Sequence, residues 1–152
     1  MHSMRIGAIL GAAALTMVTV PASDAQAVTI ACGGGASTGR VSVHGCISSE
    51  TGGIDNPFRH VTAYVKLKNT GNRALTVSYE AFGMVEGATG WTKMGNSRTN
   101  VGPGQEFGPE AVGTVTRWVC QPGKKVSIRV HAQAAGAAWS AWSPASTKQC
   151  TT

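Results

Sequence analysis

Two neighbouring stretches decide the fold: Lys125-Val126-Ser127-Ile128-Arg129-Val130-His131-Ala132-Gln133 and Trp139-Ser140-Ala141-Trp142-Ser143. Apolar and polar side chains alternate along the first stretch, which predicts a β-strand with one buried face. Lys125, Ser127, Arg129 and His131 would then share the outer face. The two tryptophans of the second stretch follow closely enough to return over that face. We therefore expect the guanidinium of Arg129 to lie within about 6 Å of the ring of Trp139 or Trp142.

The same period of two recurs through the chain, and no amphipathic helical pattern follows residue 27. Residues 40–48, 60–69 and 75–81 alternate in this way, and further strands are expected at 114–120 and at 145–150. Because only residues 70–74, which continue the turn Asn69-Thr70-Gly71-Asn72, separate 60–69 from 75–81, these two segments predict a β-hairpin. The whole pattern predicts an all-β fold, a two-sheet antiparallel sandwich of about seven strands.

Two segments lack this alternation. Glycine, asparagine, serine and proline are frequent in residues 86–113, which predicts long loops with one short edge strand. Long structureless segments in a compact domain are often functional, so Trp91, Lys93, Met94 and Arg98 form the candidate binding loop. Gly35-Ala36-Ser37-Thr38-Gly39 has the G-x-S-x-G spacing of a hydrolase nucleophile. That motif needs a large parallel sheet and a following helix, so we interpret it as a flexible glycine-rich loop.

Residues 1–27 have the composition of an export signal: a short basic start, an apolar run over 6–20, and the small-residue cleavage site Ala25-Gln26-Ala27. The run of about 15 residues is shorter than the roughly 20 that span a bilayer. We expect a cleaved signal peptide at 1–27 and a single β-sandwich domain at 28–152 of a secreted bacterial protein. A lipid anchor on Cys32 is the alternative, and it would leave an odd number of cysteines.

The four cysteines all follow the signal, and an even count in an oxidising compartment predicts disulfides. Three pairings are possible. Local spacing favours Cys32–Cys46 and Cys120–Cys150, because each would link two neighbouring strands. Zinc is the alternative, but the chain has no C-x-x-C pair and its histidines are dispersed. We expect no metal and no other cofactor.

The net charge is +6, and the cations are scattered except for Lys124-Lys125. A basic surface aids solubility and favours anionic partners such as wall polymers, polysaccharide or nucleic acid. The aromatic signature of an RNA-binding sheet is absent, so nucleic acid is not the expected partner. The carboxylates form no inward pair on a recognisable strand. Asp55 with His60 and Ser48 or Ser49 could be imagined as a triad, but nothing in the sequence sets their geometry. We therefore expect no enzymatic activity.

Residues 114–150 resemble a fibronectin type III domain. Pro122-Gly123, followed by the strand from Val126 to Ala132, looks like that family's turn into its sixth strand. The segment Trp139-Ser140-Ala141-Trp142-Ser143-Pro144 is similar to the box of type III domains in cytokine receptors, where tryptophans interleave with arginines from the sixth strand. The resemblance implies an immunoglobulin/fibronectin III-like sandwich in which Arg129 stacks with the box and Lys125 and His131 lie beside it. It implies a fold rather than a receptor function.

These observations predict an exported, monomeric β-sandwich that acts by binding, at the cell surface or in the medium. Trp139, Ser140, Trp142, Ser143 and Arg129 would brace the fold, and the loops would recognise the ligand. An anionic wall polymer, a polysaccharide or a protein is the expected partner. The alternative is a small secreted protease inhibitor that presents Lys93-Met94 or Arg98-Thr99 in an exposed loop. A weak hydrolase that uses loop residues is a third possibility.

Overall fold

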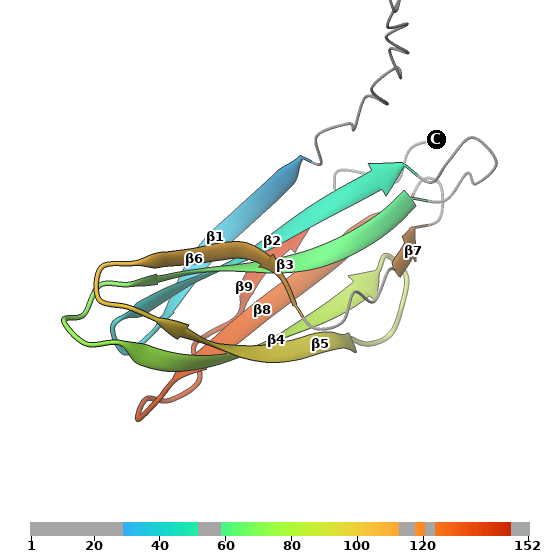
Figure 1. Cartoon of the computed structure of the whole chain (residues 1–152). Helices are drawn as coiled ribbons and strands as arrows, with labels where there is room; N and C mark the ends of the chain where they lie inside the picture. The colour runs from blue at the N-terminus through green and yellow to red at the C-terminus, as the bar shows by residue number, and fades with distance from the viewer. Residues whose placement is uncertain (1–28, 52–58, 113–117, 121–123, 147–152) are drawn as a thin grey trace, which may run out of the picture.

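Two antiparallel β-sheets pack face to face in the computed structural model, which describes residues 29–51, 59–112, 118–120 and 124–146 (Figure 1). The strands are β1 Ile30–Thr38, β2 Val41–Thr51, β3 Arg59–Asn69, β4 Leu75–Val85, β5 Thr92–Val101, β6 Glu106–Ala111, β7 Trp118–Cys120, β8 Val126–Ala134 and β9 Ser143–Ser146. The first sheet has the order β1-β2-β3-β6, with β7 also paired to β3, and the second has the order β5-β4-β8-β9. The predicted all-β sandwich is confirmed, with nine strands in the described residues rather than about seven.

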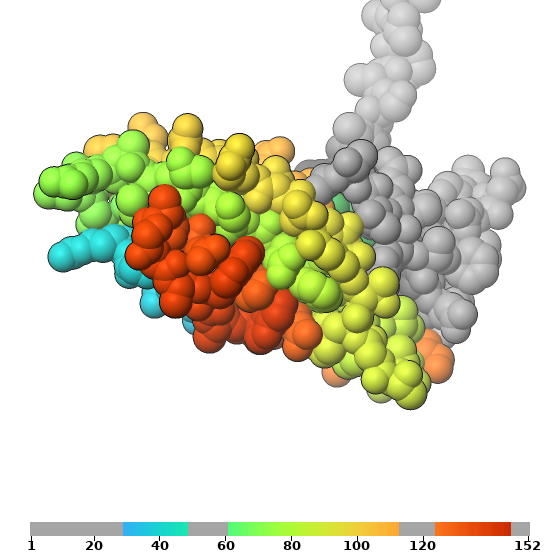
Figure 2. Space-filling model, turned by 90° about the horizontal axis from the view of Figure 1, so that it is seen from below, coloured from blue at the N-terminus to red at the C-terminus, as the bar shows by residue number. Residues whose placement is uncertain are grey.

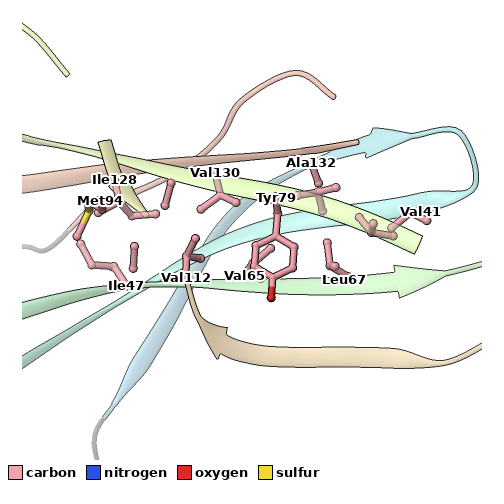
Figure 3. Close-up of a cluster of buried hydrophobic side chains, with 14 of the residues drawn as sticks. Val41, Ile47, Val65, Leu67, Tyr79, Met94, Val112, Ile128, Val130 and Ala132 are labelled. Atoms are coloured by element: carbon pink, nitrogen blue, oxygen red, sulfur yellow. The ribbon is translucent and has the colours of Figure 1, made fainter. Parts of the chain in front are cut away.

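The core lies between the sheets and follows the period-two pattern of the long strands (Figure 3). In β3 the buried side chains are Val61, Ala63, Val65 and Leu67, and in β8 they are Val126, Ile128, Val130, Ala132 and Ala134. Burying one such valine, leucine or isoleucine side chain contributes about 1.5–3 kcal/mol. The burial pattern of β8 confirms its predicted inner and outer faces, and β9 pairs with β8.

The hairpin predicted from residues 60–69 and 75–81 is wrong, because β3 and β4 belong to different sheets. Buried Asn69 directs the crossing: its Nδ2 donates to the carbonyls of Arg73 at 2.7 Å and Val101 at 3.0 Å, and its Oδ1 accepts from the Gly71 N–H at 2.8 Å. The inner faces of β3 and β4 meet across the core. Both strands therefore bury every second side chain, as two strands paired in one sheet also would, and the sequence pattern does not distinguish the two arrangements.

The long loop predicted for residues 86–113 is also wrong, since β5 and β6 lie within it. β5 is the outer strand of its sheet in the described residues, and only Met94 and Val101 of its side chains are buried. Its pairing with β4 comes from backbone hydrogen bonds, which a polar sequence permits without showing any apolar alternation.

The glycine-rich segment around residues 35–39 is strand rather than the predicted flexible loop, because β1 runs through Thr38. Gly39, with φ of +54°, makes the turn into β2. Gly33 has a packing role, since a Cβ there would clash with the carbonyl of Pro144 in β9. Glycine in β1 therefore allows the edges of the two sheets to approach closely.

The predicted Cys32–Cys46 disulfide is confirmed and joins directly paired positions of β1 and β2. The predictions for residues 1–27, Asp55 and Cys150 lie outside the described residues, and at Cys120 only the backbone is described. β9 begins at Ser143, two residues before the predicted start of the last strand. In the described part of the chain, no helix is long and apolar enough to cross a membrane.

Candidate functional site: an aromatic–cation stack

The segment between β8 and β9 returns over the outer face of β8, held there by the serines of the Trp-Ser-x-Trp-Ser sequence. The Ser140 N–H donates to the Ala132 carbonyl at 2.8 Å, and the Ser140 hydroxyl accepts from the Ala132 N–H at 3.1 Å. Fully buried Ser143 accepts from the Gly45 N–H at 2.7 Å and donates to the Gly34 carbonyl. The two serines therefore tie the segment to β8 and to the first sheet.

The tryptophans of the same segment lie on the outer face, in contact with the side chains of β8. The Arg129 Cζ lies 4.1 Å from the ring centroid of Trp142 and 4.4 Å from that of Trp91. The ring of His131 stacks on Trp142 at 3.8 Å and on Trp139 at 4.3 Å between centroids. Contacts therefore run in the order Trp91, Arg129, Trp142, His131, Trp139. We call these five side chains the aromatic–cation stack.

Phe82 of β4 supports the middle of the stack. Its ring meets Trp142 edge to face, with centroids 5.4 Å apart, and it lies 5.7 Å from the Arg129 Cζ. The Arg129 Nε is buried and has no hydrogen-bond partner among the described residues. Ring contacts therefore compensate for the burial of this cation, and a planar guanidinium is suited to them.

The expected contact of Arg129 is present with Trp142, whereas His131 is the residue that contacts both Trp139 and Trp142. Sequence reasoning missed Phe82 and the place of Trp91 in the stack. Phe82 did carry a signal, because it occupies an outward position in the alternation of β4, after Ser78 and Glu80. The sequence carries no signal for the place of Trp91, because this residue directly precedes β5, whose side chains show no apolar alternation.

A pair of charged contacts orients His131. Glu80 Oε1 lies 2.6 Å from His131 Nε2, and Glu80 Oε2 lies 2.7 Å from Lys93 Nζ. Because a carboxylate only accepts, the Nε2 of His131 carries the hydrogen in this bond. Partial burial tends to raise the pKa of Glu80, but the hydrogen bonds from Lys93 and His131 outweigh it and hold that pKa below its ordinary value of 4.5. The imidazole plane in the stack is therefore tied to β4.

The Trp139 end of the stack borders a depression of about 390 Å³ on the outer face of the second sheet. Its lining includes Ser78, Glu80, Lys93, Asn96, Arg98 and Trp139. Trp139 is 44% exposed, and Arg98 is an exposed cation with no ion-pair or hydrogen-bond partner among the described residues. Figure 2 shows this face, with the red segment that precedes and includes β9 beside the green and yellow of β4 and β5.

The four residues of the predicted binding loop therefore lie in three different places. Trp91 joins the stack, and Lys93 and Arg98 reach the depression from β5. Met94 is only 5% exposed and belongs to the core, so its place in a binding surface was predicted wrongly. Arg98 also lines a groove of about 570 Å³ that includes Tyr79, Phe107 and Glu110.

In the described part of the chain, no three His, Cys, Asp or Glu side chains lie close enough together to hold a metal ion. The Ser48 hydroxyl, which we considered for a triad, is buried and donates to the Tyr64 hydroxyl at 3.2 Å. Comparisons with protein-family models, with curated proteins and with solved structures found no match. Function is therefore inferred from the side chains of the stack and of the depression beside it.

Proposed function

We propose that this chain is an exported, non-catalytic binding module that binds its ligand on the outer face of the second sheet, at the Trp139 end of the stack. The observation that carries this proposal is the state of Trp139. One contact holds its ring on His131, yet the residue remains 44% exposed, beside polar groups and an unpaired cation. A held aromatic ring offers a large contact area with little loss of conformational entropy on binding.

The stack has two roles in this proposal. Arg129, Trp142 and His131 form its interior and brace the segment after β8, whereas Trp139 at its end contacts the ligand. The resemblance to a fibronectin type III domain agrees with this division. In immunoglobulin-like sandwiches the last strand lies beside the one before it, and that strand lies beside the third. Here β9 pairs with β8 and β8 with β4, the fourth strand, so the order corresponds with β1 counted as an added outer strand, which supports the resemblance.

Sedimentation with insoluble polymer tests the binding function. The chain from residue 28 onward is mixed with cell-wall and polysaccharide fractions in moderate salt. We expect the wild type to pellet and Trp139→Ala to stay in the supernatant, at a temperature where the variant is folded, because losing the ring contact with His131 costs only about 0.5–1.5 kcal/mol of stability. Arg73→Ala, in the β3–β4 loop, is the matched surface control and should pellet like the wild type. Equal pelleting of Trp139→Ala and the wild type would place recognition elsewhere.

Export is tested separately by the intact mass of the secreted protein. The small residues Ala25 and Ala27 predict a mature chain that begins at Val28 and carries no acyl group on Cys32. A diacylglyceryl mass on Cys32 would replace the secreted assignment with a lipid-anchored one.

A protease inhibitor is the second candidate, and one observation favours it. Arg98 and Thr99 lie in the outer strand β5, so the peptide bond between them is already in the extended form that a protease groove accepts. Lys93-Met94 loses this role because Met94 is buried. An inhibitor would block a trypsin-like protease stoichiometrically, and Trp139→Ala would leave that inhibition intact. A binding module would show no inhibition.

A further inference from the structure

The depression beside Trp139 presents three kinds of group to a ligand. Trp139 offers an apolar ring surface, Ser78 and Asn96 offer neutral hydrogen-bonding side chains, and Arg98 offers a charge. A fitting ligand therefore has a flat apolar face, several hydroxyls around it and one negative group. A pyranose ring with a carboxylate attached to C5 meets all three requirements. Its hydroxyls point outward around the rim, its C–H groups form an apolar face, and the carboxylate supplies the negative charge.

We propose that this depression binds a uronic acid unit of an acidic polysaccharide, a proposal that rests on the binding function given above. The C–H face of the sugar packs on the exposed face of Trp139. Its carboxylate accepts paired hydrogen bonds from the Arg98 guanidinium, the geometry in which arginine binds carboxylates best. Its hydroxyls exchange hydrogen bonds with Ser78 and Asn96.

The local charges agree with a ligand that carries one charge per unit. Lys93 is paired with Glu80, whose other oxygen is bonded to His131, so Arg98 supplies the unpaired charge of the depression. A nucleic acid would need a row of cations along its phosphates. The net charge of +6 over the whole chain adds a long-range attraction for an acidic polymer.

The size of the depression and the fixed position of Trp139 also fit a single sugar unit. Ligand sites commonly measure about 300–1,000 Å³, and at about 390 Å³ the depression lies at the lower end of that range, as expected for a small sugar unit. Trp139 is held by His131 at 4.3 Å, and His131 is held by Glu80 at 2.6 Å. The ring is therefore oriented before the ligand arrives, which lowers the entropy lost on binding.

The test uses the mature chain and three oligosaccharide probes: oligogalacturonate, an alginate oligomer and a glucuronate-containing oligomer. Neutral galactose oligomers and polyphosphate serve as the uncharged and the purely anionic comparisons. Binding is measured by calorimetry at low and at moderate salt. We expect at least one acidic oligosaccharide to bind about tenfold more tightly than the neutral oligomer, which corresponds to one good charged contact. Polyphosphate should not compete with it at moderate salt.

Two variants separate the contacts. Arg98→Ala should remove the preference for the acidic over the neutral oligosaccharide, and Trp139→Ala should weaken both by at least about tenfold, as for a central aromatic contact. Arg73→Ala removes the same charge at a distance and should bind like the wild type. Absence of binding to all three acidic probes, or preference that survives in Arg98→Ala, would overturn this proposal. If, in that case, sedimentation with cell-wall fractions still depended on Trp139, the proposed binding function would stand and only the uronic acid ligand would be wrong.

Discussion

Arg129→Ala tests the brace role of the stack most directly. The Arg129 Cζ lies 4.1 Å and 4.4 Å from two tryptophan centroids and 5.7 Å from that of Phe82. Each of the two nearer contacts is worth about 1 kcal/mol in a half-buried setting. Removing the side chain also relieves its buried and unpartnered Nε, which offsets up to about 1 kcal/mol. The free energy of unfolding should therefore fall by about 1–2 kcal/mol.

For a domain of this size, that loss corresponds to a melting temperature lower by about 4–8 °C. Thermal unfolding is followed by circular dichroism, because tryptophan fluorescence would also report the altered stack. Arg129→Lys keeps the charge without the flat guanidinium, so it should fall between the wild type and Arg129→Ala. Ser127→Ala, on the same face of β8, should match the wild type within about 0.5 kcal/mol.

The brace role fails if Arg129→Ala melts at the wild-type temperature. A variant that kept its stability but no longer bound its ligand would reverse the two roles of the stack, making Arg129 and Trp142 part of the recognition surface. Sedimentation of Arg129→Ala with insoluble polymer, at a temperature where the variant is folded, decides between these outcomes.

Three other changes have defined outcomes. Ser143→Ala leaves the buried Gly45 N–H without its partner, so urea denaturation should show a loss of about 1–3 kcal/mol, and a loss near zero would contradict this account. Because the pKa of Glu80 is lowered in the folded state, its stabilisation is complete well above 4.5 and is lost as the pH falls through the lower folded value. The melting-temperature difference between wild type and Glu80→Gln should therefore shrink from neutral pH to about pH 3, and a constant difference would be evidence against it. Replacing Cys32 and Cys46 by serine should lower the free energy of unfolding by about 3 kcal/mol with unchanged circular dichroism, while an unfolded variant would show that the disulfide is needed for folding itself.

The sequence was most informative where burial alone determines the strand. β3 and β8 bury every second side chain, so their alternation predicts both the strand and its inner face. Residues 86–113 were predicted poorly because β5 is an outer strand with mostly polar side chains, held by backbone hydrogen bonds to β4. Backbone pairing leaves no pattern in side-chain polarity, so β5 could not be recognised.

The candidate site divides in the same way. Arg129 and Trp142 could be placed together because one alternating strand and a short return connection limit where both can lie. Trp91 and Arg98 could not be placed, since both depend on β5 and therefore on the order of strands in the second sheet. The sequence also could not show whether the chain crosses to the other sheet after Asn69. A crossing between sheets and a hairpin within one sheet require the same alternation in the strands before and after the turn.

One pentapeptide links the stability of this sandwich to the surface that we propose for binding. The segment Trp139–Ser143 places its serines inward, on backbone groups of Ala132 and Gly45, and its tryptophans outward in the stack. The hydrogen bonds that close the edge of the sandwich therefore also fix the position of Trp139. A ligand that binds there meets a ring already ordered by the fold, and weakening the serine contacts should reduce binding and stability together.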